Sequence, residues 1–148
     1  MSSNRSRLYS ALQVGLPFLL FLSLAGNGIF EFFGGDDVMN LFTYLSQPMT
    51  HWILGAIEFW SSAWYRPLGG IVHLALFHLF GFHALPFKIF LFVALCFNLI
   101  LYFRVVRTLS GSSQIASWAL LFCSYHAVLD GLYLDFGTIY DVLGYSCY

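Results

Sequence analysis

The sequence predicts an all-α integral membrane protein, and two observations predict it: the composition and the spacing of the charges. Of the 148 residues, 59% are hydrophobic and only 9% are charged, whereas soluble chains carry about a quarter charged residues. Such a chain cannot cover its surface with polar groups in water, so lipid is the expected solvent. The net charge of -1 and the lack of a basic tract give no support for a nucleic-acid partner.

Three full transmembrane helices are expected from runs that are almost free of charge. Residues 8–30 contain no charge over 23 positions, which corresponds to about 34 Å of helix. Residues 84–103 form a second span, interrupted by Lys88, whose ammonium we expect to reach the lipid headgroups. Residues 108–129 form the third span, and residues 138–148 form the start of a truncated fourth. The chain is therefore expected to be one membrane domain.

The first run has an alternative interpretation as a cleaved signal peptide. Arg5 and Arg7 precede it, and Ser23-Leu24-Ala25 resembles a cleavage site with small residues. The run is longer than the usual signal core of about 7 to 15 residues. A retained membrane anchor is therefore favoured.

Basic residues predict the orientation, because short loops rich in Lys and Arg stay in the cytoplasm. The cluster of Arg5 and Arg7 places the N-terminus inside, and that of Arg104 and Arg107 requires an even number of crossings between the two. Residues 67–87 are therefore interpreted as a helix on the outer leaflet, although they too are free of charge. The prediction is a multi-pass protein of the plasma (inner) membrane with every acidic residue outside.

The extracytoplasmic loop, residues 31–83, is expected to lie on the membrane through amphipathic helices. At about 100° per residue, one side of residues 49–65 collects mostly large apolar side chains: Trp52, Ile53, Ala56, Ile57, Phe59, Trp60, Ala63 and Trp64. This pattern is typical of an interfacial helix, and packing against other helices is the open alternative. Four later residues share one arc and predict a polar edge on a second interfacial helix: Arg66, Gly70, His73 and Gly81.

Two adjacent carboxylates, Asp36 and Asp37, follow Gly34-Gly35 directly after the first span. An aspartate there could take a proton from an incoming hydroxyl, while its neighbour could hold a cation that offsets phosphate charge. The competing interpretation is structural: acids gather where the loop is wet, and Gly-Gly-Asp-Asp forms a turn with a helix cap. Chemistry alone favours the structural interpretation.

Other polar residues are expected on the same side of the membrane. His126 lies at the outer end of the third span, and Asp130, Asp135, Gly137 and Asp141 follow it, so the topology lets them share one outer pocket with the twin aspartates. A separate series of histidines recurs every five residues, which turns neighbours about 140° apart on a helix and prevents metal binding of the i, i+4 kind. We expect interface or packing roles for these histidines: His73, His78 and His83.

Several short segments together resemble the N-terminal part of the GT-C type membrane glycosyltransferases, and most of all the bacterial relatives of protein O-mannosyltransferases. The resemblance runs from Asp36-Asp37 through Trp64-Tyr65-Arg66-Pro67-Leu68 and the segment 80–87. It continues with the basic residues 104–109 and ends with Tyr125-His126 and Ile139-Tyr140-Asp141. The family has many more spans than this chain.

The resemblance implies transfer of a sugar from a polyprenyl-phosphate donor to an acceptor hydroxyl on the outer face, with inversion at the anomeric carbon. Asp36 would be the base, and Asp37 would orient it or bind a divalent cation (Mg²⁺, Mn²⁺ or Zn²⁺). Arg66 would contact the lipid phosphate, and His126 and Asp141 would line the substrate pocket. A second hypothesis is a small non-enzymatic multi-pass protein that binds a partner or lipid through its aromatic interfacial loop.

Overall fold

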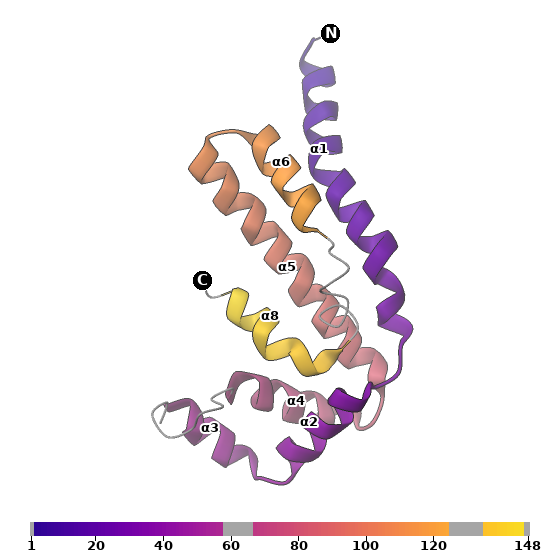
Figure 1. The fold of residues 1–148 in the computed structure, drawn as a ribbon, viewed down its shortest axis with the longest axis vertical. Coiled ribbons are helices and arrows are strands. Elements are labelled where there is room, and N and C mark those ends of the chain that lie inside the picture. Colours follow the sequence, from indigo (N-terminus) through magenta and orange to yellow (C-terminus); the bar gives the residue numbers. More distant parts are fainter. Residues whose placement is uncertain (1, 58–66, 125–134, 147–148) are drawn as a thin grey trace.

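A computed structural model describes residues 2–57, 67–124 and 135–146. These residues form helices without any strand, in the following order: α1 (Ser2–Ala25), η1 (Gly26–Phe30), α2 (Gly35–Leu45), α3 (Met49–Ile57), α4 (Pro67–Phe80), α5 (Ala84–Ser110), α6 (Ser113–Cys123), η3 (Phe136–Thr138) and α8 (Ile139–Tyr145). The prediction of an all-helical chain is confirmed for this part. Helices α1, α5 and α6 run along the long axis, α2 to α4 gather at its lower end, and α8 lies against α5 (Figure 1).

Helix α5 is the one helix in the described ranges that is long and apolar enough to cross a membrane by itself. Its 27 residues correspond to about 40 Å of helix. Helix α1 and η1 pass the same test only together with α2, from which they are bent by 62°. Membrane association therefore rests on one clear helix, and three full spans remain a prediction.

The turn after α5 lies later than the sequence suggested. We expected the second span to end at Phe103, before a basic turn, but the helix continues through Arg104 and Arg107 to Ser110. No Gly or Pro interrupts this segment, whereas Gly111 takes the left-handed conformation (φ +65°) and donates its N–H to Arg107 O at 2.9 Å. A glycine adopts this conformation without steric cost, so it sets the end of the helix.

Helix α6 begins immediately after this turn. Ser112 is its N-cap, and its hydroxyl accepts a hydrogen bond from the Ile115 N–H at 3.4 Å. The described helix ends at Cys123, whereas the third span was expected to continue through residue 129. Ser124 is the C-cap of α6, and residues 125–129 lie outside the described residues.

The hydrophobic core joins three parts of the chain along α5. Phe87, Leu91 and Leu95 of α5 form one buried cluster with residues of α1, η3 and α8. Midway along α5, Asn98 donates its side-chain N–H to Val142 O of α8 at 2.7 Å and pairs with Ser146. Because η3 lies near the beginning of α5 and Ser146 near its middle, α8 runs along α5 in the same direction.

Helices α2, α3 and α4 form a separate layer at the lower end, where the outer loop was expected. Trp52 of α3 donates its indole N–H to Tyr44 O at 3.2 Å, and the two rings meet edge to face at 4.9 Å. Gly70 of α4 lies so close to Trp52 that an added Cβ would be 3.0 Å from the indole. Helix α3 confirms the first part of the helix predicted over 49–65, and residues 58–65 of this prediction lie outside the described residues.

The predicted polar edge is wrong for Gly70 and His73, the two of its residues that lie within α4, whereas Gly81 lies in the turn after α4 and is half-buried. His73 is 1% exposed and Gly70 is buried, so this face points into the protein and not toward water. The glycines leave room for Trp52 and for Tyr140, whose Cβ lies 3.0 Å from the position that a Cβ on Gly69 would take. A face without bulk is the one that other helices can approach closely.

Candidate functional site

The site is built around Asp37, which lies in the first turn of α2. Gly34 is the N-cap of this helix, and its N–H donates to Asp37 Oδ2 at 2.9 Å. A carboxylate in the first turn that accepts the N-cap N–H is half of the capping-box arrangement. The structural interpretation of Gly-Gly-Asp-Asp as a turn with a helix cap is therefore confirmed for Asp37.

Asp37 Oδ2 also accepts a hydrogen bond from a side chain, so capping of α2 is only part of the role of Asp37. Lys88 Nζ donates to Asp37 Oδ2 at 2.8 Å, and each side chain is only 1% exposed. The expectation that Lys88 extends to the lipid headgroups is wrong, because a buried carboxylate lies within its reach. Removing one partner of such a pair would leave an uncompensated buried charge. This ion pair thus stabilises the contact between α2 and the first turns of α5.

The other oxygen of Asp37 reaches a residue 100 positions away in the sequence. Gly137 of η3 donates its N–H to Asp37 Oδ1 at 2.7 Å and to Asp135 Oδ1 at 2.8 Å. A Cβ at Gly137 would lie 2.6 Å from Asn40 Nδ2, so only glycine lets this backbone approach α2 without displacing a neighbour. The expectation that the acids of the first outer segment meet the residues after the third span is confirmed for Asp135 and Gly137.

The two carboxyl groups have opposite pKa shifts. The pKa of Asp135 is raised to about 7, mainly by burial and next by the hydrogen bond with Asp37. Burial also acts to raise the pKa of Asp37, but the hydrogen bonds from Asp135, Lys88 and Gly34 outweigh burial and lower it below its usual range. At neutral pH Asp37 is therefore ionised, and Asp135 is poised to hold or release a proton.

A buried histidine lies next to this cluster. The His73 Nδ1 atom is 2.9 Å from Gly69 O, so the nitrogen that donates to this carbonyl is Nδ1. Its Nε2 atom is buried and has no hydrogen-bond partner in the structure as described. The ring packs against those of Phe136 and Tyr44, with centroids 4.6 and 4.8 Å apart. Of the three spaced histidines, His73 is thus a packing residue, whereas His78 and His83 are exposed.

The predicted site residues differ in their exposure. Asp36 is exposed beside the buried Asp37, and Asp141 is exposed on α8. Arg66 and His126 lie outside the described residues, so their roles remain predictions. Lys88 was not among the candidates, although a lone charge in an apolar span is itself a signal that a partner exists.

A divalent cation does not fit at Asp37. Both of its oxygens already accept hydrogen bonds, from Lys88, Gly34 and Gly137. In the described ranges, no three His, Cys, Asp or Glu side chains are grouped so as to hold a metal ion. We therefore assign Asp37 a role in hydrogen bonding and ion pairing and derive no step through a metal.

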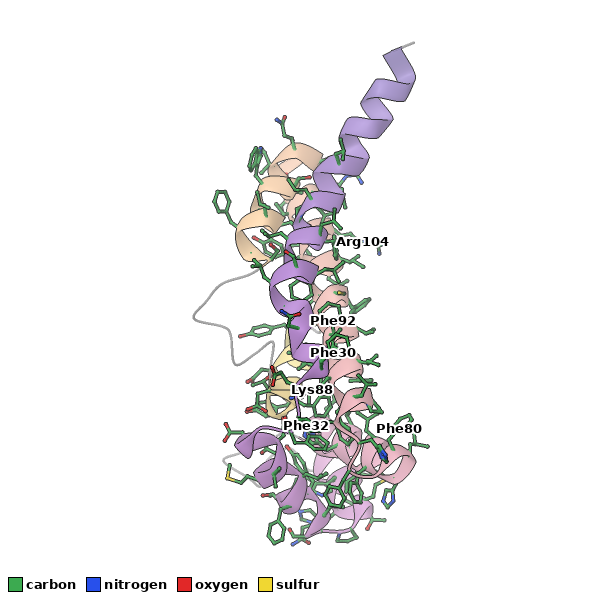
Figure 2. All side chains as sticks on the ribbon, turned by 90° about the vertical axis from the view of Figure 1, so that its right-hand side faces the viewer. Phe30, Phe32, Phe80, Lys88, Phe92 and Arg104 are labelled. Carbon is green, nitrogen blue, oxygen red and sulfur yellow. The ribbon has the colours of Figure 1, made fainter. Side chains whose placement is uncertain are left out.

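The acidic site and the basic residues of α5 lie at opposite ends of this helix. Figure 2 shows Lys88 toward the lower end of the long axis and Arg104 toward the upper end, near the turn that joins α5 to α6. Arg104 and Arg107 are exposed, as expected for residues in contact with headgroups or water. The site thus lies at one end of the helix that is long enough to span.

The fold and the site define an all-helical protein with a membrane-length helix and, at one end of it, a carboxyl pair of which Asp37 is buried and Asp135 half-buried. No family model, curated protein or solved structure matches the chain.

Proposed function

We propose that the chain is a membrane glycosyltransferase of the GT-C kind, or the N-terminal portion of one. The segments that resemble this family support the proposal, above all Asp36-Asp37 and Tyr65-Arg66-Pro67-Leu68. In this proposal a sugar passes from a polyprenyl-phosphate donor to an acceptor hydroxyl at the outer face of the membrane. The chemical step inverts the anomeric carbon.

The observation that carries the proposal is the contrast between the two neighbouring aspartates. Asp37 is 2% exposed and held by Lys88 and by backbone N–H groups of two segments, whereas Asp36 is exposed. The bonds of Asp37 fix the first turn of α2, and with it the backbone that carries Asp36. A base needs such a fixed position close to the proton that it removes.

In the proposed step, Asp36 takes the proton of the acceptor hydroxyl while the hydroxyl oxygen bonds to the anomeric carbon. The bond between that carbon and the phosphate oxygen breaks, and the polyprenyl phosphate leaves with the electron pair. Arg66, directly before α4, is proposed to pair with the phosphate through its guanidinium. His126 and Asp141 are proposed to line the same pocket.

The proposed topology places this step outside the cell. The N-terminus is cytoplasmic, α1 leads outward, α5 returns, α6 begins the third span outward, and α8 begins a fourth. The basic residues near the junction of α5 and α6, together with the acidic cluster at the far end of α5, support this orientation. The aromatic loop would then lie in the outer interface of the plasma membrane.

Sugar transfer tests the role of Asp36. In native membranes that contain the complete gene product, Asp36→Asn should lower transfer from a polyprenyl-phosphate donor by at least about 10²-fold, the usual contribution of a general base. Glu31→Gln removes another exposed carboxylate a few residues away and should leave the rate unchanged. Equal rates for Asp36→Asn and the unmodified protein would exclude Asp36 as the base.

A second candidate function is supported by the surface near the beginning of α5. A groove of about 350 Å³ is lined mainly by apolar residues, among them Phe30, Phe32 and Phe82, whose exposed fractions are 81%, 87% and 70%. Phe30 and Phe32 lie beside the lower part of the molecule (Figure 2). Exposed aromatic patches of this kind mark contacts with lipid or protein, which would suit a non-enzymatic binding protein.

The two candidate functions predict different results for one pair of variants. If the chain only binds, Phe30→Ser with Phe32→Ser should abolish the cellular phenotype, and Asp36→Asn should not. If the chain is a transferase, Asp36→Asn alone should abolish it. The comparison requires equal amounts of each variant in the membrane, measured by immunoblot.

A further inference from the structure

Two carboxyl groups and one ammonium meet where α2, α5 and η3 come together. Asp37 Oδ1 and Asp135 Oδ1 both accept the N–H of Gly137, at 2.7 and 2.8 Å, so both oxygens lie next to the same nitrogen. Each carboxyl also shifts the pKa of the other, that of Asp37 downward and that of Asp135 upward. Two ionised carboxylates have only acceptor oxygens, so a hydrogen bond between them requires a proton on one of the two.

The charges of the cluster lead to the same conclusion. With both carboxyls ionised, the ammonium of Lys88 would neutralise only one of them. The remaining negative charge would lie on the half-buried Asp135, against Asp37, whose side chain is 1% exposed. Two like charges this close disfavour ionisation of the second group. One proton shared between Asp37 and Asp135 brings the cluster to a net charge of zero.

We propose that Asp37 and Asp135 form a proton-binding site, which holds one proton between the two carboxyls and joins η3 and α8 to α2 and α5 while the proton is bound. When the proton leaves, two carboxylates oppose each other across the Gly137 N–H. The hydrogen bond between them is then lost, and η3 separates more readily from α2. The inference stands apart from sugar transfer, because it concerns a proton bound by the chain itself.

His73 is a second, independent sign that this region handles a proton. It is 1% exposed, and its buried Nε2 has no partner in the described residues. Its ring packs on Phe136, which stands between Asp135 and Gly137, and on Tyr44 of α2. A neutral imidazole whose Nδ1 proton is engaged offers Nε2 as an acceptor. An unpaired acceptor thus belongs to a ring that packs on Phe136, the residue between Asp135 and Gly137.

The other titratable and charged groups around the pair set the pH at which it releases the proton. They are Asp36 on α2, His73 on α4 and Lys88 on α5. Burial and the contact with Asp37 are the main causes that bring the pKa of Asp135 to about 7, and the charge of Asp36 acts in the same direction. The site therefore changes its proton occupancy close to neutral pH.

Infrared spectroscopy of the full chain in phosphatidylcholine vesicles tests the inference directly. We expect the carbonyl band of one protonated carboxyl to disappear as the pH rises, with a midpoint near 7. Asp135→Asn should remove this titration, whereas the control Glu31→Gln should keep it. The Asn amide can still donate to Asp37, so this variant should keep its helix content, which circular dichroism checks.

Two further measurements separate a proton site from a purely structural contact. Asp37→Asn removes the neighbouring charge, so the midpoint of Asp135 should move at least one pH unit toward acid. Amide hydrogen exchange in α8, corrected for the intrinsic pH dependence, should accelerate at least threefold between pH 6 and pH 8 in the unmodified chain and stay level in Asp135→Asn.

Three results would overturn the proton site. The first is that all carboxyls titrate below about pH 5, as ordinary side chains do. The second is that the near-neutral titration persists in Asp135→Asn, and the third is that exchange in α8 does not respond to pH. Each result leaves the proposed sugar transfer untouched, since none of these measurements involves a donor or acceptor.

Discussion

Lys88 and Asp37 illustrate how much a single pair of side chains constrains this molecule. Each is buried, and their contact at 2.8 Å joins residues that are 51 positions apart. In an apolar setting, either group alone carries a desolvation cost that its partner offsets. The pair therefore makes the position of α2 depend on that of α5.

Removing the ammonium should expose this dependence. Lys88→Met leaves Asp37 as an unpaired buried charge and should lower the free energy of unfolding by about 3–5 kcal/mol. The double variant Lys88→Met with Asp37→Asn should recover part of the loss, because no uncompensated charge remains. Chemical denaturation in detergent micelles, followed by circular dichroism, measures both values.

Arg104→Met serves as the control, since it removes an exposed positive charge near the other end of the same helix. Its effect should stay within about 0.5 kcal/mol. If Lys88→Met destabilised the chain no more than this control, the ion pair would not contribute to stability.

The acid pair should also give stability a maximum in pH. The folded chain keeps the Asp135 proton up to a pKa of about 7, whereas the unfolded chain loses it near the ordinary value of 3.8. The contribution of Asp135 is therefore complete below about pH 4 and falls as the pH rises toward 7. Asp37 behaves in the opposite way: its pKa is lowered, so its contribution is lost as the pH falls below 3.8.

Denaturation midpoints measured from pH 3 to pH 8 should therefore be highest between the acid pH at which the Asp37 contribution is lost and the pH of about 7 at which the Asp135 contribution is lost. In Asp135→Asn the decline toward pH 7 should become much smaller, while the decline in acid should remain. A stability that rose steadily from pH 4 to pH 7 in the unmodified chain would contradict the shift assigned to Asp135.

Two glycines of this fold have quite different conformations and surroundings. Gly111 ends α5 with a φ of +65°, whereas Gly144 lies inside α8 with no atom within 4 Å of an added Cβ. A side chain at the first position is strained by the backbone itself, and at the second it has open space. The same substitution should therefore have opposite effects.

Gly111→Ala should destabilise the chain by about 1 kcal/mol, because alanine resists the left-handed conformation. Gly144→Ala should be neutral or stabilise it by up to about 1 kcal/mol, because alanine loses less backbone entropy in a helix. Thermal unfolding of the two variants in the same detergent measures the difference. Equal shifts in the same direction would show that Gly111 is not what ends α5.

At the scale of the whole molecule, the arrangement of the two ends predicts which surfaces meet the cytoplasm. With the native cysteines replaced by serine, Thr108→Cys near the basic end of α5 should resist a membrane-impermeant thiol reagent added to intact cells. Gln47→Cys, after α2, should react readily. Both native side chains are exposed, so burial does not explain a difference. Ready labelling of Thr108→Cys from outside would reverse the proposed orientation.

The helical class and the approximate places of α1, α5 and α6 could be predicted from apolar runs, because hydrophobic length alone identifies helices of this kind. The end of α5 was misplaced by seven residues, from Phe103 to Ser110, because two arginines were taken as a loop. Charge indicates which side of a membrane a segment prefers, whereas glycine conformation determines where the chain turns.

The candidate site was predictable only in part. The sequence order predicted that residues near Asp135 and Gly137 would lie close to the twin aspartates, and the contact between Gly137 and Asp37 confirms this. It did not predict that Asp37 would be buried and Asp36 exposed. The sequence also did not predict the ion pair between Asp37 and Lys88. A lysine near the end of a span can extend to lipid headgroups or pair with a buried acid, and the sequence pattern is the same in both cases. That choice depends on the position of α2, which only tertiary contacts determine.

The contact between Asp37 and Gly137 has a consequence for how the chain acquires its shape. Helices α5 and α6 are joined by Gly111 and Ser112 alone, so their hairpin can form from neighbouring residues. Closing the 100 residues between Asp37 and Gly137 costs roughly 4 kcal/mol of loop entropy. We therefore expect the contact between Asp37 and Gly137 to form late in folding. In a partly folded chain, the ion pair between Lys88 and Asp37 would form before the protonated Asp135 packs against Asp37.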